Sequence, residues 1–126
     1  MPANFVDLTA SGSPVTLSVL VPVYNEQHRV QQVLKEALAV PYPVPVEVVV
    51  VDDGSTDETP HLLGNVDDSR VVVVRHARNR GKGAAIRTAA VHAGGTHLVI
   101  LDADLEYDPV NILDLLRPVP GRLCRA

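Results

Sequence analysis

A short apolar run followed by two closely spaced carboxylates is the most chemically suggestive stretch of this sequence. Residues 98–101 read Leu-Val-Ile-Leu, and Asp102 and Asp104 follow with one residue between them. Four apolar residues in a row predict a parallel strand covered on both faces, and in extended chain residues i and i+2 point the same way. Asp102 and Asp104 are therefore able to share one cation. The alternative is that Asp104 merely opens a loop.

Further carboxylates lie near similar apolar runs. Asp52 and Asp53 follow residues 46–51, and Glu106 lies two residues beyond Asp104. Two like charges about 4 Å apart repel by about 4 kcal/mol at an effective dielectric constant of about 20. A cluster of this kind needs raised pKa values, a cation or outward rotation. The metal ligands would all be oxygen atoms, because these stretches contain no Cys and no His-rich spacing. Oxygen ligands favour hard cations, so we expect Mn²⁺ or Mg²⁺.

A basic segment lies between these acidic loops. Residues 69–101 contain no Asp or Glu, yet they hold six of the eleven Lys and Arg residues. Such a segment is either a solvated face or the anion-binding side of a phosphate site. Within it Arg80, Gly81 and Lys82 suit a diphosphate, because glycine lets the backbone approach closely and lysine supplies a point charge.

Other familiar motifs are absent or misplaced. Residues 81–83 give G-x-G, but they follow the third predicted strand, and Ile86 stands where a third small residue belongs, which disfavours a nicotinamide Rossmann site. Neither G-x-x-x-x-G-K-[ST] nor G-x-S-x-G occurs. His76, His92 and His97 offer imidazoles, but we predict structural or surface roles for the last two.

The amino-acid composition excludes several classes of protein. The 126 residues carry a net charge of -4 and are 3% aromatic, which disfavours nucleic-acid binding. The lone Cys124 excludes an internal disulfide and a thiolate zinc site. No apolar run approaches the roughly 20 residues that span a bilayer, and residues 1–8 lack a signal-peptide pattern. We therefore expect no transmembrane segment and a cytoplasmic location.

Hydrophobic periodicity predicts one α/β domain. Strands are expected over residues 16–23, 46–51, 71–74 and 97–101. Helices are expected to carry the apolar positions within residues 30–38, 85–93 and 112–116, and a short helix with a Ser55–Glu58 capping box is expected to end at Gly64 and Asn65. Alternating strands and helices predict a parallel sheet, with ligands bound beyond the carboxyl ends of its strands.

The predicted domain is flanked by less regular segments. We expect a loose arm over residues 1–14, an α/β unit over 15–117 and an irregular tail over 118–126.

Four motifs occur in order along this unit. They are S-V-L-V-P-V-Y-N-E at 18–26, V-V-V-D-D-G-S-T-D at 49–57, N-R-G-K-G-A-A at 79–85 and D-A-D-L-E at 102–106. Together they resemble glycosyltransferase family 2, in particular the dolichol- and polyprenyl-phosphate sugar synthases. The resemblance implies a GT-A fold, which is a Rossmann-like, mostly parallel sheet with flanking helices, here truncated after about four strands. It also implies a UDP- or GDP-sugar donor, a divalent cation and inversion at the anomeric carbon.

The resemblance also implies a role for each matching residue. The nucleotide-sugar pocket would be formed by Pro22, Tyr24, Glu26, Val51, Asp53, Arg80, Gly81, Lys82, Asp102 and Ala103. Among these, Asp53 would hydrogen-bond the base. The catalytic pair would be Asp102 and Asp104, and the metal ligands would be Asp102, Asp104 and Glu106. The lipid-phosphate sugar synthases often carry Gln where this chain has Glu106.

The implied acceptor is a polyprenyl or dolichyl phosphate, which would place the protein at the cytoplasmic membrane face. Family members continue with an acceptor-binding half, so we expect these residues to supply only the donor-binding half. An exposed sheet edge would then favour self-association. Two alternatives stay open: a nucleotide-binding or assembly module without turnover, and a sugar-phosphate nucleotidyltransferase, which the absence of a glycine-rich signature after the first strand disfavours.

Overall fold

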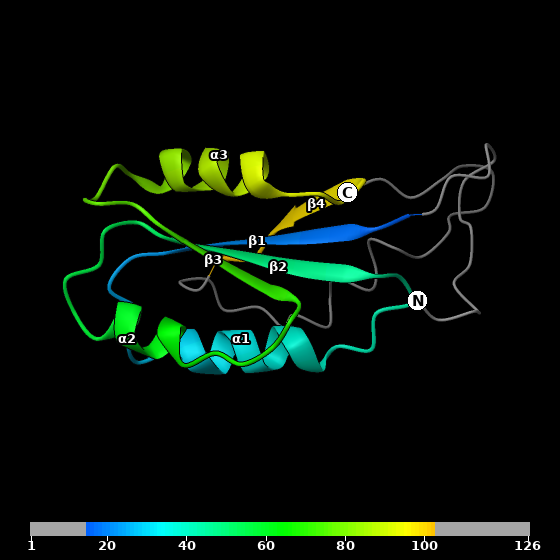
Figure 1. Ribbon diagram of the computed structural model, residues 1–126, viewed down its shortest axis with the longest axis horizontal. Helices are drawn as coiled ribbons and strands as arrows, with labels where there is room; N and C mark the ends of the chain where they lie inside the picture. The colour runs from blue at the N-terminus through cyan, green and yellow to red at the C-terminus, as the bar shows by residue number, and fades with distance from the viewer. Residues whose placement is uncertain (1–14, 103–126) are drawn as a thin grey trace.

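The computed structural model describes residues 15–102, in which strands and helices alternate strictly (Figure 1). The strands are β1 (Leu17–Val23), β2 (Val46–Asp52), β3 (Val71–Arg75) and β4 (His97–Ile100). The helices are α1 (Val30–Ala39), α2 (Thr59–Gly64) and α3 (Lys82–His92). The predicted α/β class is confirmed, and each strand agrees with its predicted range to within one residue at either end. The arm, the tail and the predicted last helix lie outside the described residues.

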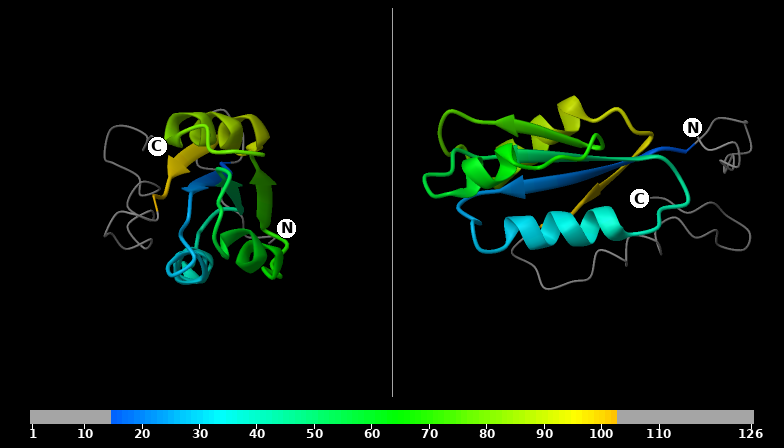
Figure 2. Two further views of the ribbon diagram at one scale, coloured as in Figure 1. Left: turned by 90° about the vertical axis from the view of Figure 1, so that its left-hand side faces the viewer. Right: turned by 60° about the horizontal axis from the view of Figure 1, so that its bottom comes forward.

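The four strands form one parallel sheet in the order β3-β2-β1-β4 (Figure 2). β1 is central among them, paired with β2 from Leu17 opposite Val46 to Val23 opposite Asp52, and with β4 on its other side. The chain therefore builds outward from β1 to β3 and then returns to place β4 beside β1. Strand order reverses at this point, and α/β sheets bind ligands at the carboxyl ends of strands beside such a reversal.

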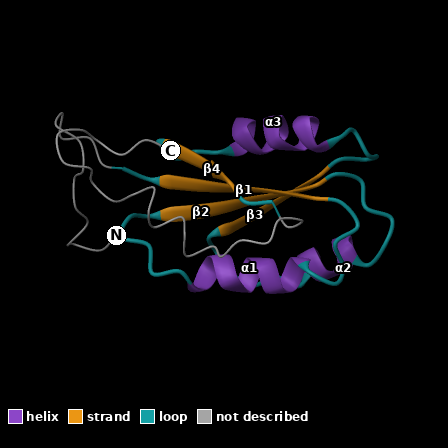
Figure 3. Ribbon diagram, turned by 180° about the vertical axis from the view of Figure 1, so that it is seen from behind, coloured by secondary structure: helices purple, strands orange, loops and turns teal. Residues whose placement is uncertain are grey.

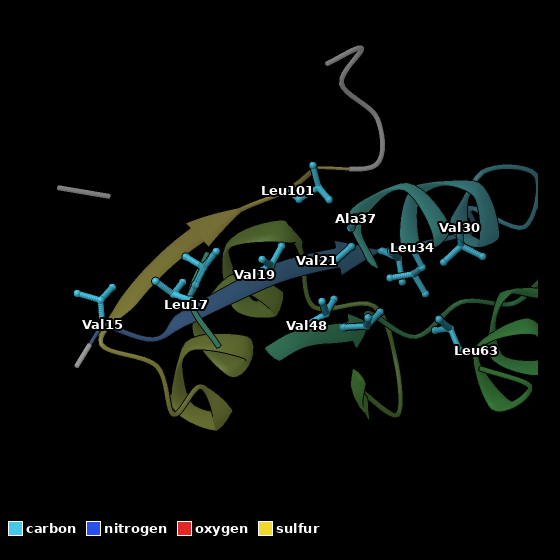
Figure 4. Packing of buried hydrophobic residues seen from close by; sticks show 13 residues of the cluster. Val15, Leu17, Val19, Val21, Val30, Leu34, Ala37, Val48, Leu63 and Leu101 are labelled. Carbon is cyan, nitrogen blue, oxygen red and sulfur yellow. The ribbon is translucent and has the colours of Figure 1, made fainter. Parts of the chain in front are cut away.

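Helices cover the two faces of the sheet, with α1 and α2 on one face and α3 on the other (Figure 3). Under α1 and α2, side chains of β1 such as Leu17, Val19 and Val21 join Val30 and Leu34 in the larger core (Figure 4). Under α3, buried residues of the smaller core are Leu20, Val49, Val51, Ala85 and Ala89. The small alanines let α3 lie close to the sheet.

Two predictions about local structure are wrong. The short helix α2 begins at Thr59 with Glu58 as its N-cap, and no side chain caps it there, so Ser55 and Glu58 form no capping box. Ser55 is instead buried and accepts a hydrogen bond from the backbone N–H of Asn25.

The second wrong prediction concerns β4, which was expected to be covered on both faces. Leu98 and Ile100 are 40% and 46% exposed. The reason is that α3 packs over β1 and β2, which leaves its side of β4 open in the described part of the chain. Within residues 15–102, no helix combines the length and apolar character needed to cross a bilayer.

Candidate active site

A cavity of about 220 Å³ opens at the carboxyl edge of the sheet. The loops that follow β1, β2 and β3 gather at this edge, which faces left in Figure 1. The cavity is lined by Pro22, Val23, Tyr24, Glu26, Asp53, Asn79, Lys82 and Ala85. It lies where parallel α/β sheets bind their ligands.

Five of the residues predicted to bind a nucleotide sugar lie together around this cavity. Three of them, Pro22, Tyr24 and Glu26, come from the end of β1 and the turn after it. Asp53 follows β2, and Lys82 is the first residue of α3. Sequence segments some 60 residues apart thus meet at one opening, with an exposed tyrosine on its rim.

The other predicted residues lie elsewhere. Val51 is fully buried in the core beneath α3 and does not line the cavity. Arg80 and Gly81 approach through their backbone N–H groups, which bind Asp53. Asp102 is buried at the end of the described chain. The predictions for Ala103, Asp104 and Glu106 lie outside the described residues.

The carboxylate of Asp53 is anchored at the cavity by three hydrogen bonds. Its Oδ1 accepts hydrogen bonds from the Nδ1 of His76 at 2.7 Å and the backbone N–H of Arg80 at 2.9 Å. Its Oδ2 accepts one from the N–H of Gly81 at 2.9 Å. Burial by itself would raise the pKa of Asp53, but these hydrogen bonds outweigh it and lower the pKa below the usual value. Asp53 therefore stays ionised at neutral pH.

His76 lies at this site, although the sequence analysis assigned it no role there. It follows β3 directly, and only 6% of its surface is exposed. Its Nε2 lies 2.8 Å from the hydroxyl of Thr88 on α3. The available signal was its position, because a histidine at the carboxyl end of a predicted parallel strand falls at the same edge as Asp53.

Asp52 differs from its neighbour Asp53. It is 1% exposed and does not line the cavity; its Oδ1 accepts the N–H of Ser55, and its Oδ2 lies 3.7 Å from the guanidinium of Arg75. Adjacent residues in a strand point to opposite faces, which separates the two carboxylates. Asp52 therefore does not join Asp53 at the cavity, and it holds the loop after β2.

Lys82 and Asp102 form an ion pair beside the cavity. The ammonium is about half exposed, whereas the carboxylate is largely buried. Asp102 thus meets one positive charge already, and its oxygens are of the kind that hard divalent cations prefer. Over residues 15–102 no three His, Cys, Asp or Glu side chains gather in a way that could hold a metal. The described chain therefore supplies one fitting donor of the three that were predicted.

The loop after β1 is held against the loop before α2 by hydrogen bonds. The N–H of Glu26 donates to the buried hydroxyl of Thr59 at 2.9 Å. Asp57 accepts the N–H of Gln27 at 3.3 Å and the N–H of Thr59 at 2.8 Å. Burial would raise the pKa of Asp57, but these hydrogen bonds lower it overall. The rim of the cavity is therefore fixed to α2.

We expect Asp57→Ala to lower the free energy of unfolding by about 1 kcal/mol, the usual net contribution of a hydrogen bond of this kind. Because the folded-state pKa is lowered, Asp57 stabilises the protein above its unfolded-state pKa and loses this effect as the pH falls through the folded-state value. Urea unfolding at pH 7 and pH 3 measures both. The variant and the wild type should differ less at pH 3, and an equal difference at both pH values would contradict this role.

The fold and the edge cavity together define the chain as a Rossmann-like α/β domain of the GT-A type. The family model "Glycosyl transferase family 2" matches residues 18–120, which is most of the chain. The chain belongs to glycosyltransferase family 2. The predicted family and fold are thereby confirmed.

Similar proteins include both curated sequences and solved structures. An undecaprenyl-phosphate 4-deoxy-4-formamido-L-arabinose transferase of Edwardsiella ictaluri (strain 93-146) is 39% identical over 101 residues, which cover 76% of this chain and 31% of that protein. The mannosyltransferase PcManGT of Pyrobaculum calidifontis, solved with GDP-Man and Mn²⁺, is 36% identical with a TM-score of 0.67 and covers 77% and 30% of the two chains.

A third relative is S. aureus TarS 1-349 in complex with UDP-GlcNAc, at 25% identity and a TM-score of 0.69. That match covers 85% of this chain and 36% of TarS 1-349. The chain thus spans about a third of the length of the relatives it matches.

Proposed function

We infer that this chain supplies the donor-binding half of an inverting, metal-dependent glycosyltransferase. The observation that carries the proposal is the edge cavity, which is lined by both an ionised carboxylate, Asp53, and an ammonium, Lys82. A nucleoside diphosphate offers matching groups, because its base has N–H donors and its diphosphate is an anion. The relatives solved with GDP-Man and with UDP-GlcNAc support a nucleotide sugar as the ligand.

The lining residues suggest how the donor would bind. Asp53 would accept a hydrogen bond from the base, and Pro22 and Tyr24 would flank the nucleoside. Lys82 begins the 11-residue helix α3, so its charge and the helix N-terminus would both attract the diphosphate. In the reaction, the acceptor oxygen would bond to the anomeric carbon from the side opposite the departing nucleoside diphosphate, which inverts that carbon.

A divalent cation would be held by Asp102 with Asp104 and Glu106. When bound, it would stabilise the negative charge of the leaving diphosphate. The Mn²⁺ in the PcManGT structure supports a metal of this kind. Lys82, which pairs with Asp102, would neutralise phosphate charge beside this cation.

The acceptor would be a polyprenyl phosphate. The support is the Edwardsiella ictaluri relative, which is an undecaprenyl-phosphate sugar transferase. A phosphate acceptor is already an anion and needs little help from a general base, whereas a sugar hydroxyl would need one. Such an acceptor would bring the protein to the cytoplasmic membrane face.

Calorimetric titration of UDP and GDP into the 126-residue chain, with and without Mn²⁺, tests the donor site. We expect one of the two nucleotides to bind, more tightly with Mn²⁺. Lys82→Met should weaken binding by about tenfold, equivalent to about 1.4 kcal/mol, because a charge beside the diphosphate is lost. Asp104→Ala should remove the Mn²⁺ dependence.

The matched control is Lys35→Met, the same substitution at an exposed position of α1. It should bind nucleotide as the wild type does. A wild-type chain that is folded by circular dichroism and binds neither nucleotide would contradict the proposal.

A further inference from the structure

We propose that His76 is a positioning residue of the donor site. It links the carboxylate of Asp53 to helix α3 through Thr88, and so it fixes the orientation of this carboxylate, which is the hydrogen-bond acceptor of the cavity. The inference rests on the proposed function, because it assigns a task to Asp53 in binding the nucleotide. His76 itself does not line the cavity.

The direction of the first hydrogen bond follows from chemistry. A carboxylate whose pKa is lowered is ionised at neutral pH and can only accept, so the Nδ1 of His76 must carry the proton it shares with Asp53. The ring's other nitrogen faces a hydroxyl, which is able to donate or to accept. His76 therefore keeps both partners whether its ring is neutral or protonated.

The Asp53 carboxylate can accept more hydrogen bonds than these residues donate to it, and a ligand can use the remainder. An ionised carboxylate has roughly four acceptor positions. The Nδ1 of His76 and the N–H groups of Arg80 and Gly81 use one each. These three donors all lie in the loop between β3 and α3, so they fix the carboxylate from one side. The remaining capacity belongs to Oδ2, which within residues 15–102 accepts a hydrogen bond only from the N–H of Gly81.

Thr88 connects His76 to helix α3, which forms another part of the cavity lining. It lies on α3, the helix that begins at Lys82, and its hydroxyl meets His76 at 2.8 Å. The imidazole thus joins two elements that both line the cavity, the end of β2 with Asp53 and the helix with Lys82. Burial of the ring keeps water from replacing either hydrogen bond. Losing the imidazole should therefore loosen the acceptor group without removing any group that touches the ligand.

The test compares three variants with the wild type by calorimetry, using the monophosphate and the diphosphate of whichever base the wild type binds. His76→Phe keeps a ring but no hydrogen bonds, and we expect it to weaken both nucleotides by about tenfold. The two losses should be equal because the defect lies at the base end. His76→Asn should recover most of the affinity, since its amide can donate to Asp53. Thr88→Val should fall between His76→Asn and His76→Phe.

The matched control is His92→Phe, the same substitution at an exposed histidine of α3 whose Nδ1 contacts the carbonyl oxygen of Thr88. It should bind like the wild type. A second reading comes from amide exchange at Arg80 and Gly81, which should quicken in His76→Phe and not in His92→Phe.

The outcomes separate this inference from the proposed function. A wild type that binds no nucleotide overturns both. A wild type that binds, with folded His76 variants that bind equally well, overturns the inference alone. A loss confined to the diphosphate, or a folded His76→Asn no better than His76→Phe, also overturns it. If His76→Phe does not fold, His76→Asn and Thr88→Val decide the matter, and wild-type affinity in Thr88→Val together with wild-type exchange at Gly81 overturns the inference.

Discussion

Gly54→Ala is expected to lower the free energy of unfolding by about 4 kcal/mol, which is most of the stability of a marginal domain. Gly54 has φ = +75°, a conformation that residues with a Cβ adopt only at a cost of about 1–2 kcal/mol. A Cβ would also lie 2.3 Å from the carbonyl carbon of Arg78 and 2.4 Å from the backbone nitrogen of Asn79. These are main-chain atoms, so the loop itself would have to move, which adds about 2 kcal/mol or more.

Substitutions at two other glycines distinguish the effect of backbone strain from that of a steric clash. Gly81 has φ = +99°, but a Cβ there would meet nothing within 4 Å, so Gly81→Ala should lower stability by only about 1–2 kcal/mol. Gly64, the last residue of α2, has neither problem, and Gly64→Ala should stabilise the protein by up to about 1 kcal/mol. Urea unfolding followed by circular dichroism gives the order. A Gly54→Ala variant as stable as Gly81→Ala would contradict the close approach of the two loops.

The elements of the fold were predictable because each is encoded locally. The apolar runs of β1 and β2 and the spacing of Val30, Leu34 and Ala37 on α1 carry their own periodicity. The carboxyl edge followed from strict alternation of strands and helices, and with it the grouping of Tyr24, Asp53 and their neighbours. Strand order did not follow, because pairing between strands far apart in sequence leaves no local signal.

Some residues near the site lie away from the cavity or were assigned no role there, for reasons of three-dimensional packing or of strand alternation. Val51 shares a face with Asp53 but lies one step deeper, beneath α3, where it is core rather than lining. Asp52 points to the other face, which strand alternation alone could have indicated. His76 and Gly54 required the approach of loops more than 20 residues apart, which no spacing reveals.

Asp53→Ala is expected to abolish nucleotide binding and to lower the free energy of unfolding by about 4 kcal/mol. The substitution leaves the Nδ1 of His76 and the N–H groups of Arg80 and Gly81 without their acceptor. The buried imidazole costs about 1–3 kcal/mol when it loses its partner, and each of the two part-buried N–H groups costs less. Water entering the vacated space would recover part of the sum. The protein would be folded only marginally, so stability must be measured before binding.

Asp53→Asn keeps the shape and isolates the charge. Its amide retains one oxygen for these donors but turns an NH₂ group toward the others, so we expect about half the loss of stability and no binding of a base that needs an acceptor. The matched control is Asp67→Ala, an exposed aspartate whose loss should change stability by no more than about 0.5 kcal/mol.

The dependence on pH identifies the charge as the cause. Because the folded-state pKa of Asp53 is lowered, its carboxylate stabilises the wild type above the unfolded-state pKa, and this contribution disappears as the pH falls through the folded-state value. Asp53→Asn cannot titrate, so its stability should fall less than that of the wild type between pH 6 and pH 3. Parallel losses in both proteins would mean that other carboxylates dominate acid unfolding and that the hydrogen bonds of Asp53 do not depend on its charge.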